Sequence, residues 1–278
     1  MSKGVLIFAY NSKINYVDIA TIAAKLAKKH LNLPVSIVTN SVDVDYDTFD
    51  RVIFQEIEGE VYQRSFKYSS SSERMPWHNQ NRSSAYELSP YNQTLLIDAD
   101  YLMFNSSLGQ LFDTDLEFAC FDDVHDLSGR MGLKAEAHVG RPGIPMQWAT
   151  VVYFTKCQLA ESVFSYMQTI KENYAYYSAA YNFEPTLFRN DFTLSIALQV
   201  LTGYGTKNFS AIPGALITAN TGVDIVDVRD NGEIVFSWNS SDGQVSVSKI
   251  KNTNVHIMNK RSITDSVTLK KLRRLAYV

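Results

Sequence analysis

Two aspartates at the end of an apolar run are the residues of this sequence best suited to chemistry. Asp98 and Asp100 follow Leu95-Leu96-Ile97, which has the composition of a buried strand. Side chains at i and i+2 of an extended strand point the same way, so the two carboxylates repel each other unless a cation or protons intervene. Oxygen ligands favour Mg²⁺ or Mn²⁺, and Mg²⁺ commonly binds substrate phosphates as well. The pattern predicts a divalent metal site. A solvated strand end or a helix cap is the alternative.

The first 55 residues have the pattern that would position such a site. Apolar runs at 5–8, 35–38 and 51–55 predict strands, and apolar residues at helical spacing predict a helix over 16–31 that Pro34 follows. Strands and helices joined by short gaps indicate an α/β layer with parallel strand pairing. In an open α/β sheet, ligands bind beyond the carboxyl ends of the strands. We therefore expect the aspartates at that edge.

The remaining elements are predicted from the same signals. Four serines at 69–72 indicate a mobile loop over 64–82 with Trp77 as an anchor, and the polar segment 122–147 is long enough for a functional loop. Asp230-Asn231-Gly232 is a hairpin turn signal. Strands are predicted at 94–97, 116–121, 149–154 and 244–258, and helices at 83–88, 158–174, 191–201 and from about 264.

The net charge of −3 conceals a strong asymmetry. Residues 249–278 contain eight Lys and Arg and one acidic residue, Asp265, which gives +7. Since the whole chain carries −3, the preceding 248 residues carry −10. A basic C-terminal segment on an acidic body is compatible with an anionic partner or with a solvated basic helix.

Several classes of protein are excluded or disfavoured. No apolar run approaches the roughly 18 residues of a membrane span, and Met1-Ser2-Lys3-Gly4 lacks the layout of a signal peptide. Cys120 and Cys157 lie in or beside apolar stretches, so we expect free thiols and a cytoplasmic location. No zinc-ligand spacing, glycine-rich phosphate loop or repeat occurs. Phosphatases with an aspartyl nucleophile are disfavoured because their Asp-x-Asp normally follows the first strand.

The segment from Ser89 to Asp100 resembles the Asp-x-Asp strand of nucleotide-sugar-dependent glycosyltransferases of type A fold, especially their glycogenin-like and bacteriophage members. The run Val5–Tyr10 and the helix after it are similar to the opening of that family. The resemblance implies one Rossmann-like α/β domain with a mixed central sheet. It also implies a nucleotide-sugar-binding half (1–121), an acceptor half that completes the cleft (122–261) and a basic C-terminal helix (262–278).

The resemblance also implies roles for residues on the donor side. Asp98 and Asp100 would hold Mn²⁺ or Mg²⁺ against the diphosphate of a nucleoside-diphosphate sugar, with UDP as the expected nucleotide. His256, on the apolar run 255–257, would complete the metal site, although a late histidine is more often structural. The further donor contacts that the resemblance implies are Ala9, Tyr10, Asn11, Arg82 and Lys260. The spacing from His256 to Lys260 departs from the glycogenin-like pattern, in which it is longer and includes a glycine.

On the acceptor side, the resemblance assigns Asp191 a place near the transferred sugar, as a base or as a stabiliser of the cationic transition state. Its alternative role is that of a helix N-cap. Trp148 is a candidate platform for sugar stacking. Arg130 and Arg141, in the segment 122–147, are candidate acceptor or lid residues.

The acceptor itself stays open. Some bacteriophage members transfer a hexose or pentose to hydroxymethylated cytosine in DNA, and a basic segment can follow a phosphate backbone. The alternatives are a glycosyltransferase that acts on a protein or a glycan, and a nucleotide-sugar-binding protein that has lost catalysis. If the chain is phage-encoded, the expected location is the host cytoplasm. The oligomeric state cannot be predicted.

Overall fold

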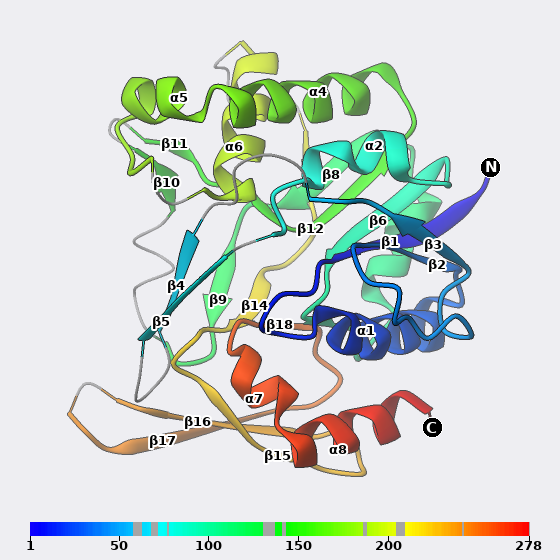
Figure 1. Ribbon diagram of the computed structural model, residues 1–278, viewed down its shortest axis with the longest axis vertical. Coiled ribbons are helices and arrows are strands. Elements are labelled where there is room, and N and C mark those ends of the chain that lie inside the picture. Colours follow the sequence, from blue (N-terminus) through cyan, green and yellow to red (C-terminus); the bar gives the residue numbers. More distant parts are fainter. Residues whose placement is uncertain are drawn as a thin grey trace.

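The computed structural model of this chain describes residues 1–57, 63–67, 72–76, 78–129, 137–140, 143–185, 188–203, 209–240 and 242–277. A seven-stranded sheet with the order β13-β8-β12-β6-β1-β2-β3 runs through its centre (Figure 1). Its strands are β1 (Lys3–Ala9), β2 (Val35–Thr39), β3 (Arg51–Phe54), β6 (Gln93–Asp98), β8 (Phe118–Phe121), β12 (Trp148–Thr155) and β13 (Ser210–Ala211).

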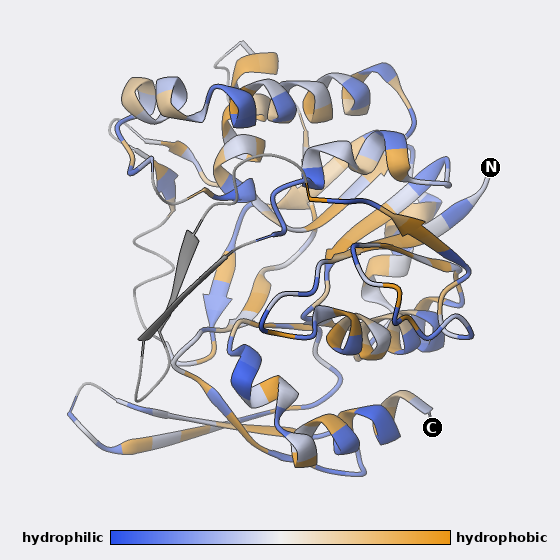
Figure 2. Ribbon diagram, viewed as in Figure 1, coloured by the Kyte–Doolittle hydropathy of each residue, from blue (hydrophilic) through white to orange (hydrophobic). Residues whose placement is uncertain are grey.

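The central sheet is mixed. β1, β2, β3 and β6 pair in parallel, and β12 runs antiparallel to both β6 and β8. The predicted α/β class, its mixed sheet and the parallel pairing of the first three strands are therefore confirmed. The strands are largely hydrophobic along their length (Figure 2), as expected for strands that are covered on both faces.

Helix α1 (Tyr16–Leu31) has the bounds that the sequence predicts. The Asn15 side chain accepts a hydrogen bond from the Asp18 N–H at 3.1 Å and caps its first turn. Asn32, at φ 53°, ends it in the left-handed conformation that asparagine tolerates. The apolar side of α1 packs on β1 and β2.

The other helices of the main body lie across the sheet from α1 in Figure 1. The helix α4 (Gln158–Glu172) packs on α6 (Asn190–Leu201), and α6 contacts β12. The short elements η1 (Arg82–Ser84) and α2 (Ala85–Leu88) precede β6. Neither α5 (Tyr174–Tyr181) nor the 3₁₀ segment η2 (Ser107–Asp113) was predicted from the sequence.

A second sheet of four short strands, in the order β7-β18-β14-β9, lies beside the first. It consists of β7 (Tyr101–Leu102), β9 (Val124–Asp126), β14 (Leu216–Ala219) and β18 (Val255–Ile257). The chain leaves the central sheet at the end of β6 and enters this sheet at β7. The two aspartates therefore lie where the chain crosses from one sheet to the other.

The C-terminal part consists of a three-stranded sheet and two helices. β15 (Asp224–Val228), β16 (Ile234–Asn239) and β17 (Val245–Ile250) form an antiparallel meander, followed after β18 by α7 (Lys260–Thr264) and α8 (Ser266–Tyr277). Gly232, at φ 81°, forms the predicted turn between β15 and β16.

The basic helix α8 packs against α1 and β15. Its side chains form ion pairs with the acidic body: Lys271 with Asp227 at 2.5 Å, Arg273 with Asp18 at 2.9 Å and Arg274 with Asp230 at 3.5 Å. Basic side chains of the C-terminal segment therefore pair with acidic side chains of the preceding 248 residues.

Two segments predicted as loops contain strands. Within 64–82, β4 (Gln63–Lys67) and β5 (Ser72–Pro76) pair antiparallel, while Trp77 lies outside the described residues. Within 122–147, β9 belongs to the second sheet, and β10 (His138–Val139) pairs with β11 (Ile144–Pro145). The loop predictions were wrong there because strand pairing depends on a partner that a local pattern does not show.

Two further findings bear on the sequence predictions. Cys120 and Cys157 are free, as expected, and Cys120 is fully buried. None of the helices in the described part of the chain is both long and apolar enough to span a membrane. The predicted boundaries at 121 and 261 stay predictions.

Candidate active site

Asp98 and Asp100 lie at the carboxyl edge of the central sheet. Asp98 is the last residue of β6 and pairs with Phe8 of β1, so it lies beside the end of the first strand. Ala99 and Asp100 form a turn instead of continuing the strand. The aspartates thus come close through a turn, and the predicted extended geometry holds only as far as Asp98.

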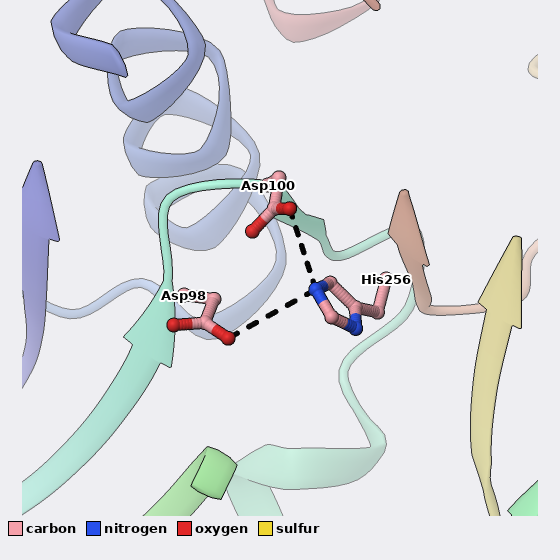
Figure 3. Close-up of side chains that lie close together, drawn as sticks. All are labelled: Asp98, Asp100 and His256. Carbon is pink, nitrogen blue, oxygen red and sulfur yellow. Dashed lines mark ion pairs between the residues drawn. The ribbon is translucent and has the colours of Figure 1, made fainter. Parts of the chain in front are cut away.

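His256 joins the aspartates across the second sheet. It lies on β18 between Tyr101 of β7 and Thr218 of β14, and the Ile257 N–H donates to the Asp100 carbonyl at 3.0 Å. Its Nε2 lies 3.3 Å from Asp100 Oδ2 and 3.9 Å from Asp98 Oδ2 (Figure 3). The residues predicted as metal ligands therefore form one cluster, in which the possible ligand atoms lie within 4.8 Å of one another.

The dimensions of this cluster suit a divalent cation. Ligands about 2.1 Å from one ion lie roughly 3 to 4.2 Å from each other, and the two distances from His256 fall in that interval. Two carboxylate oxygens and one imidazole nitrogen are a donor set that Mn²⁺ and similar divalent ions accept. Asp100 is nearly buried, with 7% of its side chain exposed, whereas Asp98 is 20% exposed and remains reachable from solvent.

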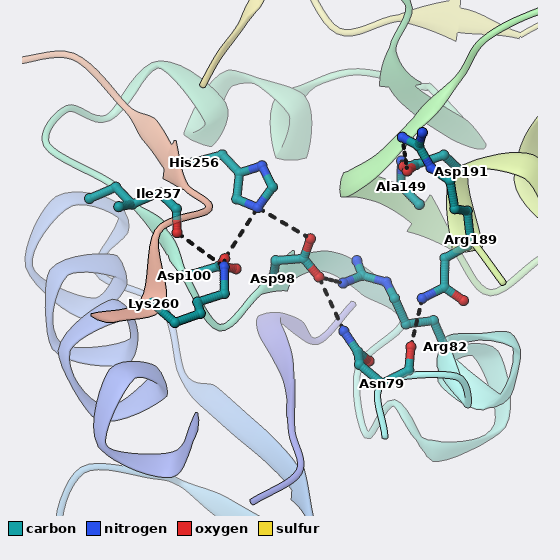
Figure 4. A network of polar contacts seen from close by, with 11 residues as sticks. Asn79, Arg82, Asp98, Asp100, Ala149, Arg189, Asp191, His256, Ile257 and Lys260 are labelled. Atoms are coloured by element: carbon teal, nitrogen blue, oxygen red, sulfur yellow. Dashed lines mark hydrogen bonds and ion pairs between the residues drawn. The ribbon is translucent and has the colours of Figure 1, made fainter. Parts of the chain in front are cut away.

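Each aspartate also contacts a cationic side chain (Figure 4). Arg82 Nη1 contacts Asp98 Oδ1, and Asn79 Nδ2 lies 3.4 Å from the same oxygen. Lys260 Nζ contacts Asp100 Oδ2 and donates to the Ile257 carbonyl at 3.1 Å. Two of the predicted donor contacts, Arg82 and Lys260, therefore lie against the predicted metal ligands.

Arg82 is almost fully buried, yet part of its guanidinium has no partner. Its exposed fraction is 1%, and neither Nε nor Nη2 has a hydrogen-bond partner among the residues that the structure describes. A buried donor without a partner is costly, so such N–H groups suit an anionic or oxygen-rich ligand.

The predicted nucleotide residues lie near the end of β1 and have structural partners. Ala9 is the last residue of β1. Tyr10 is 2% exposed, and its hydroxyl contacts Gln55. Burial raises the pKa of this hydroxyl well above the ordinary range, and a hydrogen bond with the Asn81 side chain lowers it by less. The Asn11 side chain accepts from the Val17 N–H at 3.0 Å, at the start of α1.

Asp191, the residue expected near the transferred sugar, lies apart from Asp100 and His256 in Figure 4, beyond the Arg82 side chain. Asp191 is the second residue of α6 and not its N-cap, because the cap position is Arg189. Its carboxylate accepts from the Ala149 N–H at 2.8 Å and pairs with Arg189 at 3.1 Å. These contacts join β12 to α6, so a structural role alone explains them.

Trp148 is 6% exposed, and the Arg189 guanidinium lies 5.9 Å from its ring centroid. Its ring therefore offers little surface for sugar stacking in this conformation. Arg130 and Arg141 lie outside the described residues.

Three residues of the site were missed by the sequence analysis. Asn79 binds Asp98 and receives a hydrogen bond from Asn190 Nδ2 through its carbonyl, at 2.8 Å, which links the cluster to the start of α6. Thr218 lies beside His256, and its buried Oγ1 has no partner within the described part of the chain. Asn259 caps α7 through the Ser262 N–H. Of the three, only Asn259 has a local sequence signal, because asparagine is a preferred N-cap residue whose side chain accepts from the N–H three residues later.

Comparisons with known proteins are limited to similarity of fold. No family model and no curated protein matches the chain. The glycosyltransferase GlyE of Streptococcus pneumoniae TIGR4 is similar at 13% identity with a TM-score of 0.44, over 77% of this chain and 46% of that one. The chain thus spans about half the length of this structure.

Two further solved structures are similar over larger shares of their own length. The galactosyltransferase LgtC, in complex with donor and acceptor sugar analogs, matches at 14% identity and a TM-score of 0.47 over 70% of each chain. A putative glucose-1-phosphate thymidylyltransferase from Bacillus anthracis, in complex with a sucrose, matches at 11% identity and a TM-score of 0.41 over 77% and 88%.

Proposed function

We propose that this chain is a metal-dependent glycosyltransferase of type A fold, which moves a sugar from a nucleoside-diphosphate donor, with UDP as the expected nucleotide, to an acceptor. The observation that carries the proposal is the cluster of Asp98, Asp100 and His256 at the carboxyl edge of the sheet. Mn²⁺ or Mg²⁺ is the proposed cofactor.

The proposed division of labour follows from the charges. Asp98, Asp100 and His256 hold the cation, which when bound stabilises the negative charge of the leaving diphosphate. Arg82 and Lys260 add positive charge beside the same position. The unpartnered N–H groups of Arg82 support its role as a contact of the donor phosphates or sugar.

The remaining donor and acceptor roles are proposed from the resemblance to glycosyltransferases of type A fold. Ala9, Tyr10 and Asn11 are proposed to border the nucleoside at the end of β1. Asp191 and Trp148, with Arg130 and Arg141, are proposed to face the acceptor. The Asp191 carboxylate is bonded to the Ala149 N–H and to Arg189, and its side chain is 17% exposed. A catalytic role therefore requires that the bound substrates reach this carboxylate.

A glycan or protein acceptor is favoured over DNA. The basic C-terminal segment was the main argument for a nucleic-acid partner, but three of the basic side chains of α8 are ion-paired with Asp18, Asp227 and Asp230. A phosphate backbone would have to displace these carboxylates or use the other basic residues. Hydroxymethylated cytosine in DNA is thus the second candidate acceptor, and the +7 charge is what supports it.

One assay distinguishes a glycosyltransferase from a protein that only binds nucleotide sugars. The protein is incubated with Mn²⁺ and a panel of nucleoside-diphosphate sugars, UDP-sugars first, with glycans, with hydroxymethylated DNA or without acceptor, and nucleotide release is followed. The proposal predicts metal-dependent release with at least one donor. If no nucleotide is released with any donor, catalysis is contradicted, and a nucleotide-sugar-binding protein is the remaining interpretation.

The same assay decides between the acceptors. DNA is the acceptor if it stimulates nucleotide release. The stimulation should then weaken, while donor hydrolysis persists, when the basic residues of α8 are neutralised, namely Lys270, Lys271, Arg273 and Arg274. Release stimulated by a glycan, with no effect of DNA, supports the favoured one.

A further inference from the structure

Lys260 covers the oxygen through which Asp100 would bind a metal. Its Nζ contacts Asp100 Oδ2, and this is the carboxylate oxygen that lies 3.3 Å from His256 Nε2. Only 8% of the Lys260 side chain and 7% of the Asp100 side chain are exposed. The contact is therefore a shielded ion pair at the centre of the predicted ligand set, and not a surface pair of small energy.

The local fold holds the ammonium in this position. Lys260 is the first residue of α7, whose N-cap is Asn259. The Asn259 side chain accepts from the Ser262 N–H at 3.2 Å and donates to Asp224 Oδ1 at 2.8 Å and to the Val223 carbonyl at 3.1 Å. The start of α7 is thus anchored to β15 and the residue before it.

The lysine is also tied to the turn that carries Asp100. Lys260 Nζ donates to the Ile257 carbonyl at 3.1 Å, and the Ile257 N–H donates to the Asp100 carbonyl at 3.0 Å. The ammonium therefore contacts the oxygens of both Asp100 and Ile257 and has little access to water. Removing it from Asp100 leaves a nearly buried carboxylate without that partner, unless another cation replaces it.

The arrangement at Asp98 differs in a way that matters for metal binding. Arg82 contacts Oδ1 of Asp98, whereas Oδ2 is the oxygen that faces His256 at 3.9 Å. Arg82 can therefore stay in place when Oδ2 coordinates a cation. At Asp100 the ammonium and the cation would need the same oxygen, and two positive charges at one carboxylate oxygen repel each other.

We propose that Lys260 is an internal cation that occupies the Asp100 ligand position when no metal is bound, and that it competes directly with the divalent cation for that oxygen. The inference rests on the metal site of the proposed function. Loading of the site requires Lys260 Nζ to leave Asp100, and the diphosphate of the donor is the anion that can then receive it. Metal alone is held weakly, since it must displace the ammonium without that compensation.

The test measures Mn²⁺ binding without nucleotide, by the electron paramagnetic resonance signal of free Mn²⁺. Four proteins are compared: the wild type, Lys260→Met, Lys260→Arg and Lys251→Met. Methionine preserves most of the apolar stem and removes the charge, arginine retains the charge, and Lys251 is an exposed lysine of the same basic segment. Thermal unfolding of each variant, with and without Mn²⁺, shows that the variants are folded and gives a second measure of binding.

The expected result is that Lys260→Met binds Mn²⁺ at least about tenfold more tightly than the wild type and gains a larger Mn²⁺-dependent rise in Tm. Lys260→Arg and Lys251→Met are expected to stay within about twofold of the wild type, a difference within ordinary surface effects. An unchanged or weaker Mn²⁺ affinity of Lys260→Met, in a protein whose wild type binds Mn²⁺, overturns the competition and leaves the metal site intact. No Mn²⁺ binding by any of the four proteins overturns the metal site itself and, with it, this inference.

Discussion

His256 is the antiparallel partner of Tyr101, the residue that follows Asp100, and this register places the imidazole Nε2 3.3 Å from Asp100 Oδ2. The candidate metal site therefore depends on the pairing of β7 with β18, two very short strands from distant parts of the chain. Asp98 belongs to the other sheet. Stability of the junction between the sheets and competence of the site should consequently be coupled.

Replacing Arg82 by Met is expected to destabilise the fold. The substitution leaves Asp98 without its ion-pair partner beside a buried position, which we expect to lower the free energy of unfolding by about 2 kcal/mol. This is less than for a fully buried pair because Asp98 is 20% exposed. Urea denaturation measures the effect, and Arg51→Met, on the exposed edge strand β3, is the control. A loss no larger than that of the control would contradict the energetic role of the pair.

Asn259 is expected to act through two separable sets of hydrogen bonds. Asn259→Ala removes the cap of α7 and both amide bonds, and should lower the free energy of unfolding by about 1 to 2 kcal/mol. Asn259→Ser preserves an oxygen that can cap the helix but loses the bonds to Val223 and Asp224. We expect it to be intermediate in urea denaturation. Equal stability of the serine variant and the wild type would show that the amide bonds contribute nothing.

The pair between Arg273 and Asp18 should give a small, salt-dependent coupling between α8 and α1. Both side chains are more than 40% exposed, so a double-mutant cycle with Arg273→Met and Asp18→Asn should yield about 0.2 to 1 kcal/mol at low salt. At 1 M salt, where the Debye length is about 3 Å, the coupling should nearly vanish. A coupling that persists unchanged at high salt would contradict a screened surface ion pair as its origin.

Asp265 should make the stability of the C-terminal helix depend on acid pH. Its carboxylate accepts from the N–H groups of Thr268 and Val267, each at 3.1 Å, and these bonds, Thr268 foremost, hold its pKa below the ordinary value of 3.8. A folded-state pKa below the unfolded one contributes stability above about pH 4, which is lost as the pH falls through the folded pKa.

The variant Asp265→Ser tests this pH dependence, because serine can still cap the helix but cannot titrate in this range. The wild type should have the higher Tm at pH 6, and the difference should shrink toward pH 3. A difference in Tm that stays constant over that interval would show that the carboxylate charge does not contribute.

Much of the N-terminal half could be predicted from the sequence. The helix α1 was predicted with its final bounds because apolar residues recur at helical spacing over 16–31 and Pro34 follows. The strand before Asp98 was recognised because strands covered on both faces are continuously apolar. His256 was found only through the resemblance, since nothing in its own segment indicates the register with β7.

The parts that could not be predicted depend on contacts between distant residues. The serine run at 69–72 is typical of a loop, and nothing local shows that the segments around it pair with each other. The same holds for β9, whose partner β14 lies far along the chain. The ion pairs of α8 were missed for a related reason, because a count of charges does not show that Asp18 lies beside Arg273. The basic segment therefore suggested an external partner, although much of its charge is matched within the fold.

The central claim is that Asp98, Asp100 and His256 hold one divalent cation. Its most direct test is a crystal of the protein grown with Mn²⁺ and a nucleoside diphosphate, measured at the manganese absorption edge. One anomalous peak is expected in contact with Asp98 Oδ2, Asp100 Oδ2 and His256 Nε2, and it should be lost in Asp100→Asn. An ordered site without a peak, or a peak that persists in Asp100→Asn, would contradict the proposed metal site.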